Sequence, residues 1–278
     1  MATATAIKAG EKSTVEAVQH IRRMRGGAQS QLMRCSDGRY YVVKFRNNPQ
    51  HPRVLVNEML ATTLAEQIGL PVPTTAIVKV DDFLIRHTPE LNIQLAHTSI
   101  PCEAGLQFGS CYVVDPLVGQ VFDYLPTEML PVVRNSQTFA GVLVFDKWIG
   151  NVDLRQATFW RRCRERKYSA CFIDQGHCFN AGTWSFPDDP LRGVYGRMEV
   201  YGAVQGWESF EPWLSRIESF NENSIWCAAL EIPPEWYDNK WSELERLVEK
   251  LIYRRGVVRD LIDAFRVSAR RPFPQWKQ

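Results

Sequence analysis

Two aspartates stand at positions suited to phosphoryl chemistry. Asp153 ends the polar turn 150–153 that follows an apolar run, and Asp174 ends the returning strand of a hairpin predicted to reach 170–173. Gly176 comes two residues after the second acid. A phosphotransferase needs one carboxylate to orient a hydroxyl and one to hold magnesium on the phosphates. The pattern therefore predicts a phosphotransferase, although a helix cap and a simple bend have the same composition.

Lys44 and Glu58 form a second pair of candidate residues. The strand predicted over 40–45 turns Lys44 and Tyr41 to opposite faces, because side chains alternate along a strand. Glu58 follows 14 residues later, beside the apolar stripe of a helix predicted over 55–68. Kinases hold nucleotide phosphates with such a strand lysine and inward helix glutamate. A lysine reaching water and a marginal glutamate would give the same pattern without any function.

A glycine pair lies between the strands predicted over 15–24 and 31–35. Glycine has no Cβ, so backbone N–H groups in this turn can approach phosphates closely. A plain hairpin turn has the same composition. The candidate phosphate-binding residues are Gly26, Gly27, Ala28, Gln29 and Ser30.

The composition sets broad limits on the class of protein. The chain has 278 residues, 45% of them hydrophobic, and 33 Lys and Arg against 31 Asp and Glu. It can bury a large core as one domain or two lobes, and its balanced charge gives no direct evidence for nucleic acid. The sequence has no run of 18 apolar residues and no apolar leader, so it predicts no membrane segment. Its seven scattered cysteines indicate reduced thiols. We therefore expect a cytoplasmic protein without membrane contact.

The remaining elements follow from periodicity and from turn residues. A basic stretch at 161–167 is expected to be a solvent-exposed hairpin tip that points away from the two aspartates. The other predictions are strands at 75–80, 83–88 and 108–114, a loop at 89–107, a lobe boundary within 110–125, and helices at 136–144, 241–253 and 257–267.

With these residues in order, the chain resembles the HipA-like kinase family, part of the wider protein-kinase and phosphoinositide-kinase fold. The matching stretches are GGAQSQLM with YVVKF, NEMLATTLAEQIGLPVP, FGSCYV, WIGNVD and FIDQGHCF. The resemblance implies an α+β, bilobal protein-kinase-like fold. Residues 1–115 would form an N-lobe of antiparallel sheet plus helix, and residues 116–278 a mostly helical C-lobe.

The resemblance also implies ATP and Mg²⁺ as cofactors. In that arrangement Lys44 holds the phosphates, Glu58 positions Lys44, Asp153 orients the acceptor hydroxyl and Asp174 binds the metal. The family usually has an asparagine five residues after the catalytic aspartate as a second metal ligand, and Thr158 stands at that position here.

A hydroxyl is a poorer magnesium ligand than an amide carbonyl, so Thr158 predicts weakened activity unless Asn151 or Gln156 takes its place. The first hypothesis is a kinase for a serine or threonine hydroxyl of a protein of unknown identity, or of the chain itself at a loop serine such as Ser30. The alternatives are a pseudokinase or nucleotide-binding interaction module, and a small-molecule or lipid kinase. The glycine turn comes so early that we expect no N-terminal subdomain of the toxin-type members, and we infer neither toxin activity nor a DNA-binding antitoxin partner.

Overall fold

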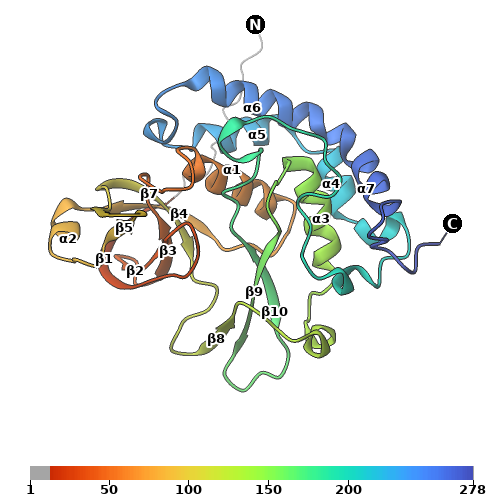
Figure 1. Cartoon of the computed structure of the whole chain (residues 1–278), viewed down its shortest axis with the longest axis horizontal. Coiled ribbons are helices and arrows are strands. Elements are labelled where there is room, and N and C mark those ends of the chain that lie inside the picture. Colours follow the sequence, from red (N-terminus) through yellow and green to blue (C-terminus); the bar gives the residue numbers. More distant parts are fainter. Residues whose placement is uncertain (1–12, 278) are drawn as a thin grey trace, which may run out of the picture.

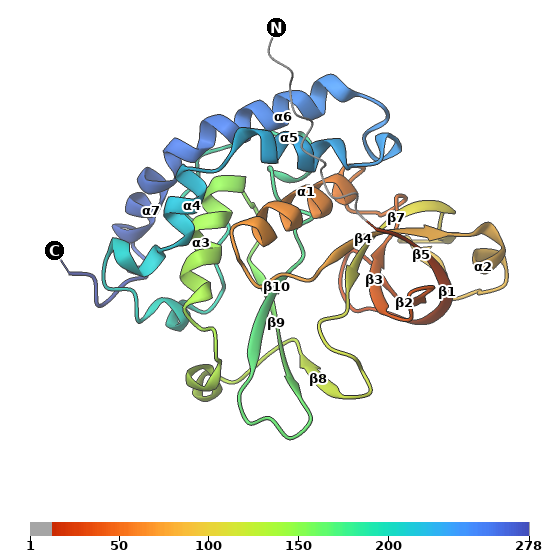
Figure 2. The same cartoon turned by 180° about the vertical axis from the view of Figure 1, so that it is seen from behind.

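A computed structural model describes residues 13–277. The first 12 residues of the predicted N-lobe, and Gln278, lie outside this described part. Figure 1 shows a barrel of strands on one side of the molecule and a group of helices on the other. Helix α1 (Val54–Gln67) lies between them, and Figure 2 shows the same arrangement from behind.

The N-terminal strands close into a barrel instead of an open sheet. Neighbouring strands are antiparallel except for β1 and β4, whose parallel pairing closes the ring. The sequence predicted a small antiparallel sheet, but neither the pairing of β7 with β3 and β4 nor this closure, because strands far apart in the chain form them. In barrel order the strands are β1 (Thr14–Arg23), β2 (Gln31–Cys35), β3 (Tyr40–Lys44), β7 (Gly105–Cys111) and β4 (Thr75–Val80).

The predicted alternation along β3 is confirmed. Tyr41, Val43 and Phe45 are buried in the barrel core together with Met33. Lys44 therefore leaves the barrel on the opposite face, toward α1. The core of the barrel fixes the direction of the lysine side chain.

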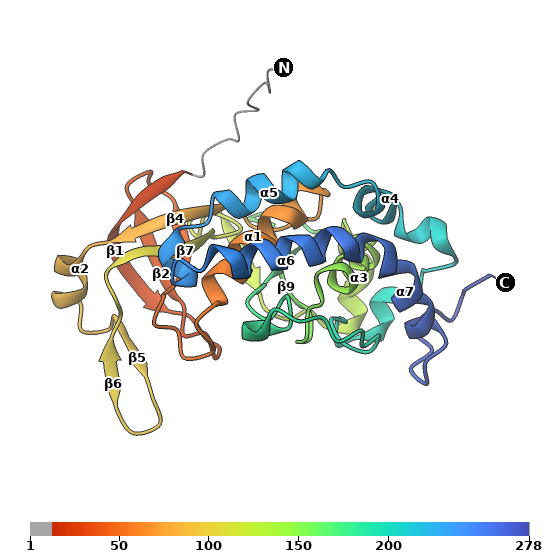
Figure 3. The ribbon, with the colours of Figure 1, turned by 90° about the horizontal axis from the view of Figure 1, so that it is seen from above.

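Two predictions in the barrel region were wrong. Residues 83–88 were predicted as a strand, but the chain forms helix α2 (Asp82–Arg86) there, and the Asp81 side chain accepts a hydrogen bond from the backbone N–H of Phe83 at 2.7 Å. This cap outweighs the apolar composition of the segment. The segment 89–107 was predicted as loop, yet it holds β5 (Asn92–Gln94), β6 (Ser99–Pro101) and the start of β7. Figure 3 shows the β5–β6 hairpin extending away from the barrel.

Helix α1 is buried on every side from Val54 to Ala65. Its apolar residues share one hydrophobic core with the C-terminal helices. The predicted helix is confirmed, but its buried surface extends around the helix and is not limited to a single apolar stripe. Polar residues inside it, including Glu58, must therefore find partners within the protein.

The second lobe combines a small sheet with helices. The sheet has the order β10–β9–β8, with β9 and β10 forming the predicted hairpin. Its strands are β8 (Gly119–Phe122), β9 (Gln156–Arg162) and β10 (Ser169–Ile173). The α-helices are α3 (Thr138–Ile149), α4 (Trp213–Glu218), α5 (Glu222–Leu230), α6 (Trp241–Arg254) and α7 (Val258–Arg266). The 3-10 helices are η1 (Thr127–Val132), η2 (Ala181–Thr183), η3 (Met198–Tyr201), η4 (Trp207–Phe210), η5 (Pro234–Tyr237) and η6 (Arg255–Val257).

Helix α3 is the centre of the second lobe. All of its residues are buried, and Gly141 admits the Trp213 ring so closely that a Cβ would stand 2.3 Å from it. The predicted lobe boundary at 115 and 116 falls in the turn between β7 and β8, and it stays a prediction about domain organisation. All seven cysteines are free thiols. In the described part of the chain, no helix has the length and apolarity needed to cross a membrane.

Candidate active site

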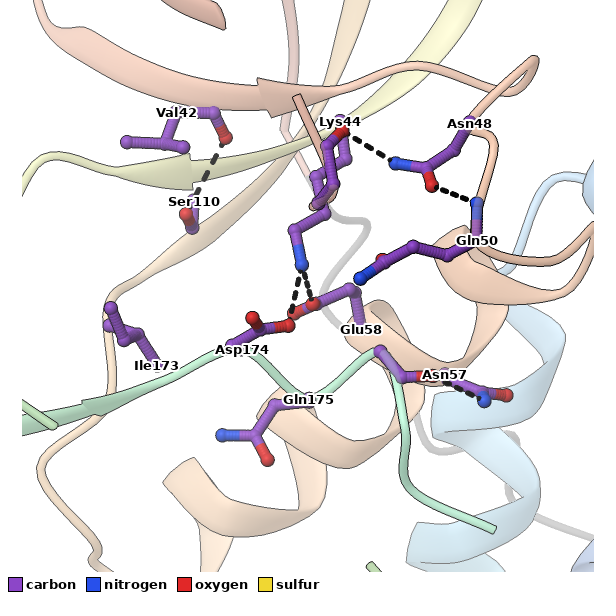
Figure 4. Close-up of polar contacts among 12 residues, drawn as sticks. Val42, Lys44, Asn48, Gln50, Asn57, Glu58, Ser110, Ile173, Asp174 and Gln175 are labelled. Atoms are coloured by element: carbon purple, nitrogen blue, oxygen red, sulfur yellow. Dashed lines mark hydrogen bonds and ion pairs between the residues drawn. The ribbon is translucent and has the colours of Figure 1, made fainter. Parts of the chain in front are cut away.

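Lys44 lies between two carboxylates, one from α1 and one from the end of β10. Its Nζ forms an ion pair with Glu58 and a second ion pair with Asp174, at 2.8 Å from Oδ1. Figure 4 shows the three side chains converging from β3, α1 and the loop after β10. The predicted pairing of Lys44 with Glu58 is confirmed, and it places three predicted residues at one point.

The electrostatics of this cluster keep Lys44 and Asp174 charged. Burial alone would lower the pKa of Lys44, but the charges of Glu58 and Asp174 raise it above its ordinary value. Burial would raise the pKa of Asp174, but the Lys44 ammonium lowers it to about 2. For Glu58, burial raises the pKa, and the nearby Asp174 charge adds to that effect while Lys44 opposes it. Asp174 is the more exposed of the two carboxylates, with 20% of its side chain exposed against 4% for Glu58.

The loop that follows Asp174 is held against α1. A Cβ on Gly176 would lie 2.8 Å from the Val54 side chain and 3.3 Å from Glu58 Oε1, so only glycine fits this approach. The Asn57 side-chain nitrogen lies 2.8 Å from the carbonyl oxygen of Gly176 and 2.9 Å from that of Cys178. The D-x-G spacing therefore has a packing reason in addition to any chemical one.

His51 gives the same loop a further support. Its Nε2 donates to the carbonyl oxygen of Gly176 at 2.8 Å, and burial lowers the pKa of the ring. Sequence reasoning missed both Asn57 and His51. A polar residue inside an otherwise apolar helix, directly before Glu58, was the available signal for Asn57.

Asp153 sits on a loop that a buried ion pair supports. The side chains of Asp146 on α3 and Arg155 have no exposure to solvent, and Arg155 Nε lies 2.9 Å from Asp146 Oδ2. Asn151 donates to Asp146 Oδ1 and accepts from the backbone N–H of Asp153, each at 3.1 Å. Asp153 itself is exposed, and its Oδ1 accepts from the N–H of Leu154 at 2.7 Å. The sequence did not predict the ion pair, although an acid inside the apolar run of α3 was a signal for a buried partner.

One cleft contains most of the predicted site residues. Its volume is about 870 Å³, and Asp153 and Asp174 both line it, as predicted. The connector after β7 contributes Tyr112 and Val113. The predicted residues on its wall are Gly26, Gly27, Ala28, Ser30, Lys44, Glu58, Asp153, Thr158 and Asp174.

Among the predicted site residues, Gln29 is the one that does not line the cleft. Its Nε2 donates to the carbonyl oxygen of Gln94 on β5, and its Oε1 accepts from the N–H of Gln94, both at 2.7 Å. The side chain therefore ties the glycine turn to the β5–β6 hairpin. A contribution of Gln29 to phosphate binding would have to come from its backbone.

The polar side chains near the position of the second metal ligand are differently engaged. Thr158 Oγ1 donates to the carbonyl oxygen of Phe122 at 3.3 Å. Gln156 lines the cleft, and its Nε2 donates to Asp174 Oδ2 at 2.9 Å. Asn151 is buried, and both ends of its side chain are occupied by the contacts with Asp146 and Asp153.

The basic tip lies at the far end of the β9–β10 hairpin from Asp174, as predicted (Figure 1). Arg161 stacks over the Tyr168 ring at 4.9 Å, and Glu165 pairs with Arg134 at 3.2 Å. Arg161 and Glu165 of the tip therefore have their partners on the hairpin itself and on the segment before α3.

The cleft suits a cation that is bound jointly with phosphates. Within residues 13–277 no three His, Cys, Asp or Glu side chains gather into a site that would hold a metal by themselves. Asp174 offers an ionised carboxylate, and the Gln156 amide lies against it. Magnesium typically takes one or two protein oxygens and completes its shell with water and phosphate oxygens. The residues present fit that mode of binding.

The barrel lobe and the helical lobe are those of a bilobal, α+β kinase-like fold. Its cleft holds a buried lysine–glutamate pair, and an aspartate–glycine loop and an exposed aspartate line it. The family model described as HipA-like kinase matches residues 17–161, more than half of the chain. The chain therefore belongs to the HipA-like kinase family, and the resemblance seen in the sequence is confirmed. No curated protein matches the chain.

Solved structures similar to the chain at low identity include two that are described as kinases. HipA of Shewanella oneidensis MR-1, in complex with HipB and operator DNA, has a TM-score of 0.49 and 12% identity, covering 89% of this chain and 68% of that one. The Helicobacter pylori proinflammatory kinase CtkA has a TM-score of 0.45 and 13% identity, covering 91% and 96%. A Golgi casein kinase with Mn and ADP bound has a TM-score of 0.48 and 10% identity, covering 93% and 75%. The family assignment rests on the match over residues 17–161.

Proposed function

We propose that this HipA-like kinase transfers the γ-phosphate of ATP to a serine or threonine hydroxyl of a protein. The observation that carries the proposal is the contact of Lys44 with both Glu58 and Asp174, in the cleft that Asp153 also lines. A lysine held between two carboxylates is fixed in position, and its ammonium can pair with phosphate oxygens that enter the cleft. The cleft volume of about 870 Å³ is within the range of small-ligand sites.

The nucleotide would lie along the barrel side of the cleft. The turn from Gly26 to Ser30 would present backbone N–H groups to the phosphates, and Tyr112 and Val113 would lie beside the base. Glu58 would keep Lys44 directed at the phosphates through the Lys44–Glu58 ion pair. These roles rest on position and charge.

Asp174, assisted by a second oxygen ligand, would hold Mg²⁺ with the phosphates. When bound, the cation supplies positive charge that stabilises the charge on the transferring phosphoryl group. The protein's own contribution is to keep Asp174 ionised, and the low pKa of about 2 supports that role.

Asp153 would orient the acceptor and take its proton. The acceptor oxygen forms a bond with the γ-phosphorus, the bond from that phosphorus to the bridging oxygen of ADP breaks, and the hydroxyl proton passes to the Asp153 carboxylate. The exposure of Asp153 supports a macromolecular acceptor, because a side chain on another protein's surface can reach it. Its neighbour Leu154 is 56% exposed, which leaves apolar surface beside the acceptor position.

The test is phosphate transfer from γ-labelled ATP in the presence of Mg²⁺, with a peptide library as acceptor and with the chain alone. The parent is expected to label peptides at serine or threonine. Asp153→Asn should lower the rate by about 10²–10⁴-fold while ADP still binds. The matched control is Asp260→Asn, an exposed acid on α7 at a distance from the cleft.

Three outcomes would change the proposal. ATP binding without transfer to any acceptor would favour a pseudokinase. Transfer to a lipid or a small molecule but not to peptides would assign the alternative acceptor class. Labelling of the chain alone would make the chain its own acceptor, and mass spectrometry would show whether Ser30 is the phosphorylated residue.

A further inference from the structure

We propose that Gln156 supplies the second protein oxygen for the divalent cation held by Asp174, in place of the asparagine that the family usually carries at the position of Thr158. The inference rests on the proposed function, because the cation is the one that accompanies the nucleotide. It concerns which residue of this chain completes the metal site.

The register of the β9–β10 hairpin brings Gln156 to Asp174. Gln156 is the first residue of β9 and pairs directly with Ile173, the residue before Asp174. Its side chain reaches the carboxylate, with Nε2 at 2.9 Å from Oδ2. The other carboxylate oxygen, Oδ1, is taken by Lys44 at 2.8 Å. Gln156 therefore contacts the one oxygen of Asp174 that Lys44 leaves available.

The chemistry of an amide fits both states of this site. A glutamine side chain carries a donor nitrogen and an acceptor oxygen on the same carbon. Without a cation, the nitrogen donates to the Asp174 carboxylate, as the structure shows. If Asp174 held a cation, a half-turn of the amide would offer its oxygen to the metal, and carboxylate and amide oxygens are ligands that Mg²⁺ accepts. Gln156 is exposed within the cleft, so this rotation meets little packing.

Thr158 is in a poorer position for the same task. It pairs with Cys171, two residues further along the hairpin from the Ile173 pairing, which is about 7 Å along a strand. Its side chain is shorter than that of glutamine, and its hydroxyl donates to the carbonyl oxygen of Phe122 at 3.3 Å. Thr158 is only 4% exposed. The Thr158 hydroxyl is therefore both further from the Asp174 carboxylate and engaged with another acceptor.

Asn151 is excluded by its existing contacts. Its Nδ2 donates to Asp146 Oδ1 and its Oδ1 accepts from the N–H of Asp153. Turning its oxygen to a metal would break the support of the loop that carries Asp153. Of Thr158, Asn151 and Gln156, only Gln156 has a side-chain oxygen that can turn toward Asp174 without breaking another contact.

The test counts bound Mn²⁺ on the full chain with saturating ADP, by electron paramagnetic resonance of the free ion. The parent is expected to bind two Mn²⁺ ions with different affinities. Gln156→Ala should weaken the second ion by about 10–100-fold and leave the first ion and ADP nearly unchanged. Gln156→Asn keeps the amide on a shorter side chain, so its affinity for the second ion should fall between those of the parent and of Gln156→Ala. The matched control is Gln120→Ala on β8, where the glutamine pairs with Arg161 outside the cleft.

The rival ligand is tested with Thr158→Val, which replaces the hydroxyl with a methyl group of similar size. The inference is overturned if Thr158→Val weakens the second ion, if Gln156→Ala leaves it unchanged, or if the parent with ADP binds a single ion. Circular dichroism and thermal unfolding of each variant verify that it is folded. A parent that binds no ADP at all would instead defeat the proposed function, so the two failures are distinguishable.

Discussion

Arg155 and Asp146 form an ion pair that has no exposure to solvent, and it joins three parts of the site. Asp146 belongs to α3, Arg155 follows Asp153 by two residues, and Arg155 Nη1 also donates to the carbonyl oxygen of Ile173 at 3.1 Å. The loop with Asp153 and the strand end before Asp174 are therefore fixed to the same buried guanidinium. The relative placement of the two aspartates depends on this pair.

We predict that Arg155→Met destabilises the fold by about 3–5 kcal/mol, because it leaves the Asp146 carboxylate buried without its partner. The free energy of unfolding from urea titration is the measurement. Arg86→Met is the control, since it removes an exposed pair with Asp82 and should cost less than about 1 kcal/mol. The double variant Asp146→Leu with Arg155→Met should be more stable than Arg155→Met alone. If it is equally unstable, the unpaired charge is not the cause.

Gly176→Ala should separate the Asp174 loop from α1. The added Cβ would stand 2.8 Å from the Val54 side chain and 3.3 Å from Glu58 Oε1, so either the loop or α1 must shift. We expect a loss of about 1–3 kcal/mol in unfolding free energy and faster hydrogen exchange in the loop after Asp174. Gly256→Ala is the matched control, because a Cβ there meets no atom within 4 Å. Equal behaviour of the two variants would show that the close approach to α1 is unimportant.

The low pKa of Asp174 predicts a pH dependence of stability. Its pKa is lowered from 3.8 to about 2 in the folded protein, so its contribution is complete above the unfolded value and is lost as pH falls through about 4 to 2. The contribution is about 2 kcal/mol. The difference in unfolding free energy between the parent and Asp174→Asn should therefore shrink by about this amount between pH 5 and pH 2. A difference that stays constant over this range would mean that Lys44 does not hold the carboxylate in its ionised form.

Local pattern was enough to find the residues that meet at Lys44. Alternation along β3 placed Tyr41 in the core and Lys44 outside, and helical spacing placed Glu58 on an inward position. Both inferences use only neighbours in sequence, which the side-chain periods of strands and helices determine. The kinase-like fold was an implication of the resemblance to the HipA-like kinase family, which these residues helped to establish.

Long-range contacts could not be predicted in the same way. The parallel pairing of β1 with β4 and the pairing of Asp146 with Arg155 depend on how separate elements meet. The strand predicted over 83–88 was wrong because the Asp81 cap outweighs apolar composition over a few residues. The choice between Thr158 and Gln156 needed the hairpin register, which the sequence leaves open by a residue or two.

The substitution Thr158→Asn tests that choice by function. If the family's usual asparagine were missing and unreplaced, restoring it should raise phosphate transfer at low Mg²⁺. We expect no increase, because Gln156 already lies against Asp174 and position 158 is two residues further along β9. We also expect a loss of stability of about 1–3 kcal/mol, because the larger amide enters a site that is 4% exposed and loses the hydrogen bond to Phe122. The measurement is the initial rate across a Mg²⁺ titration for the parent, Thr158→Asn, Gln156→Ala and the double variant. A rate that rises in Thr158→Asn, or a double variant that recovers the activity lost in Gln156→Ala, would return the second ligand to position 158.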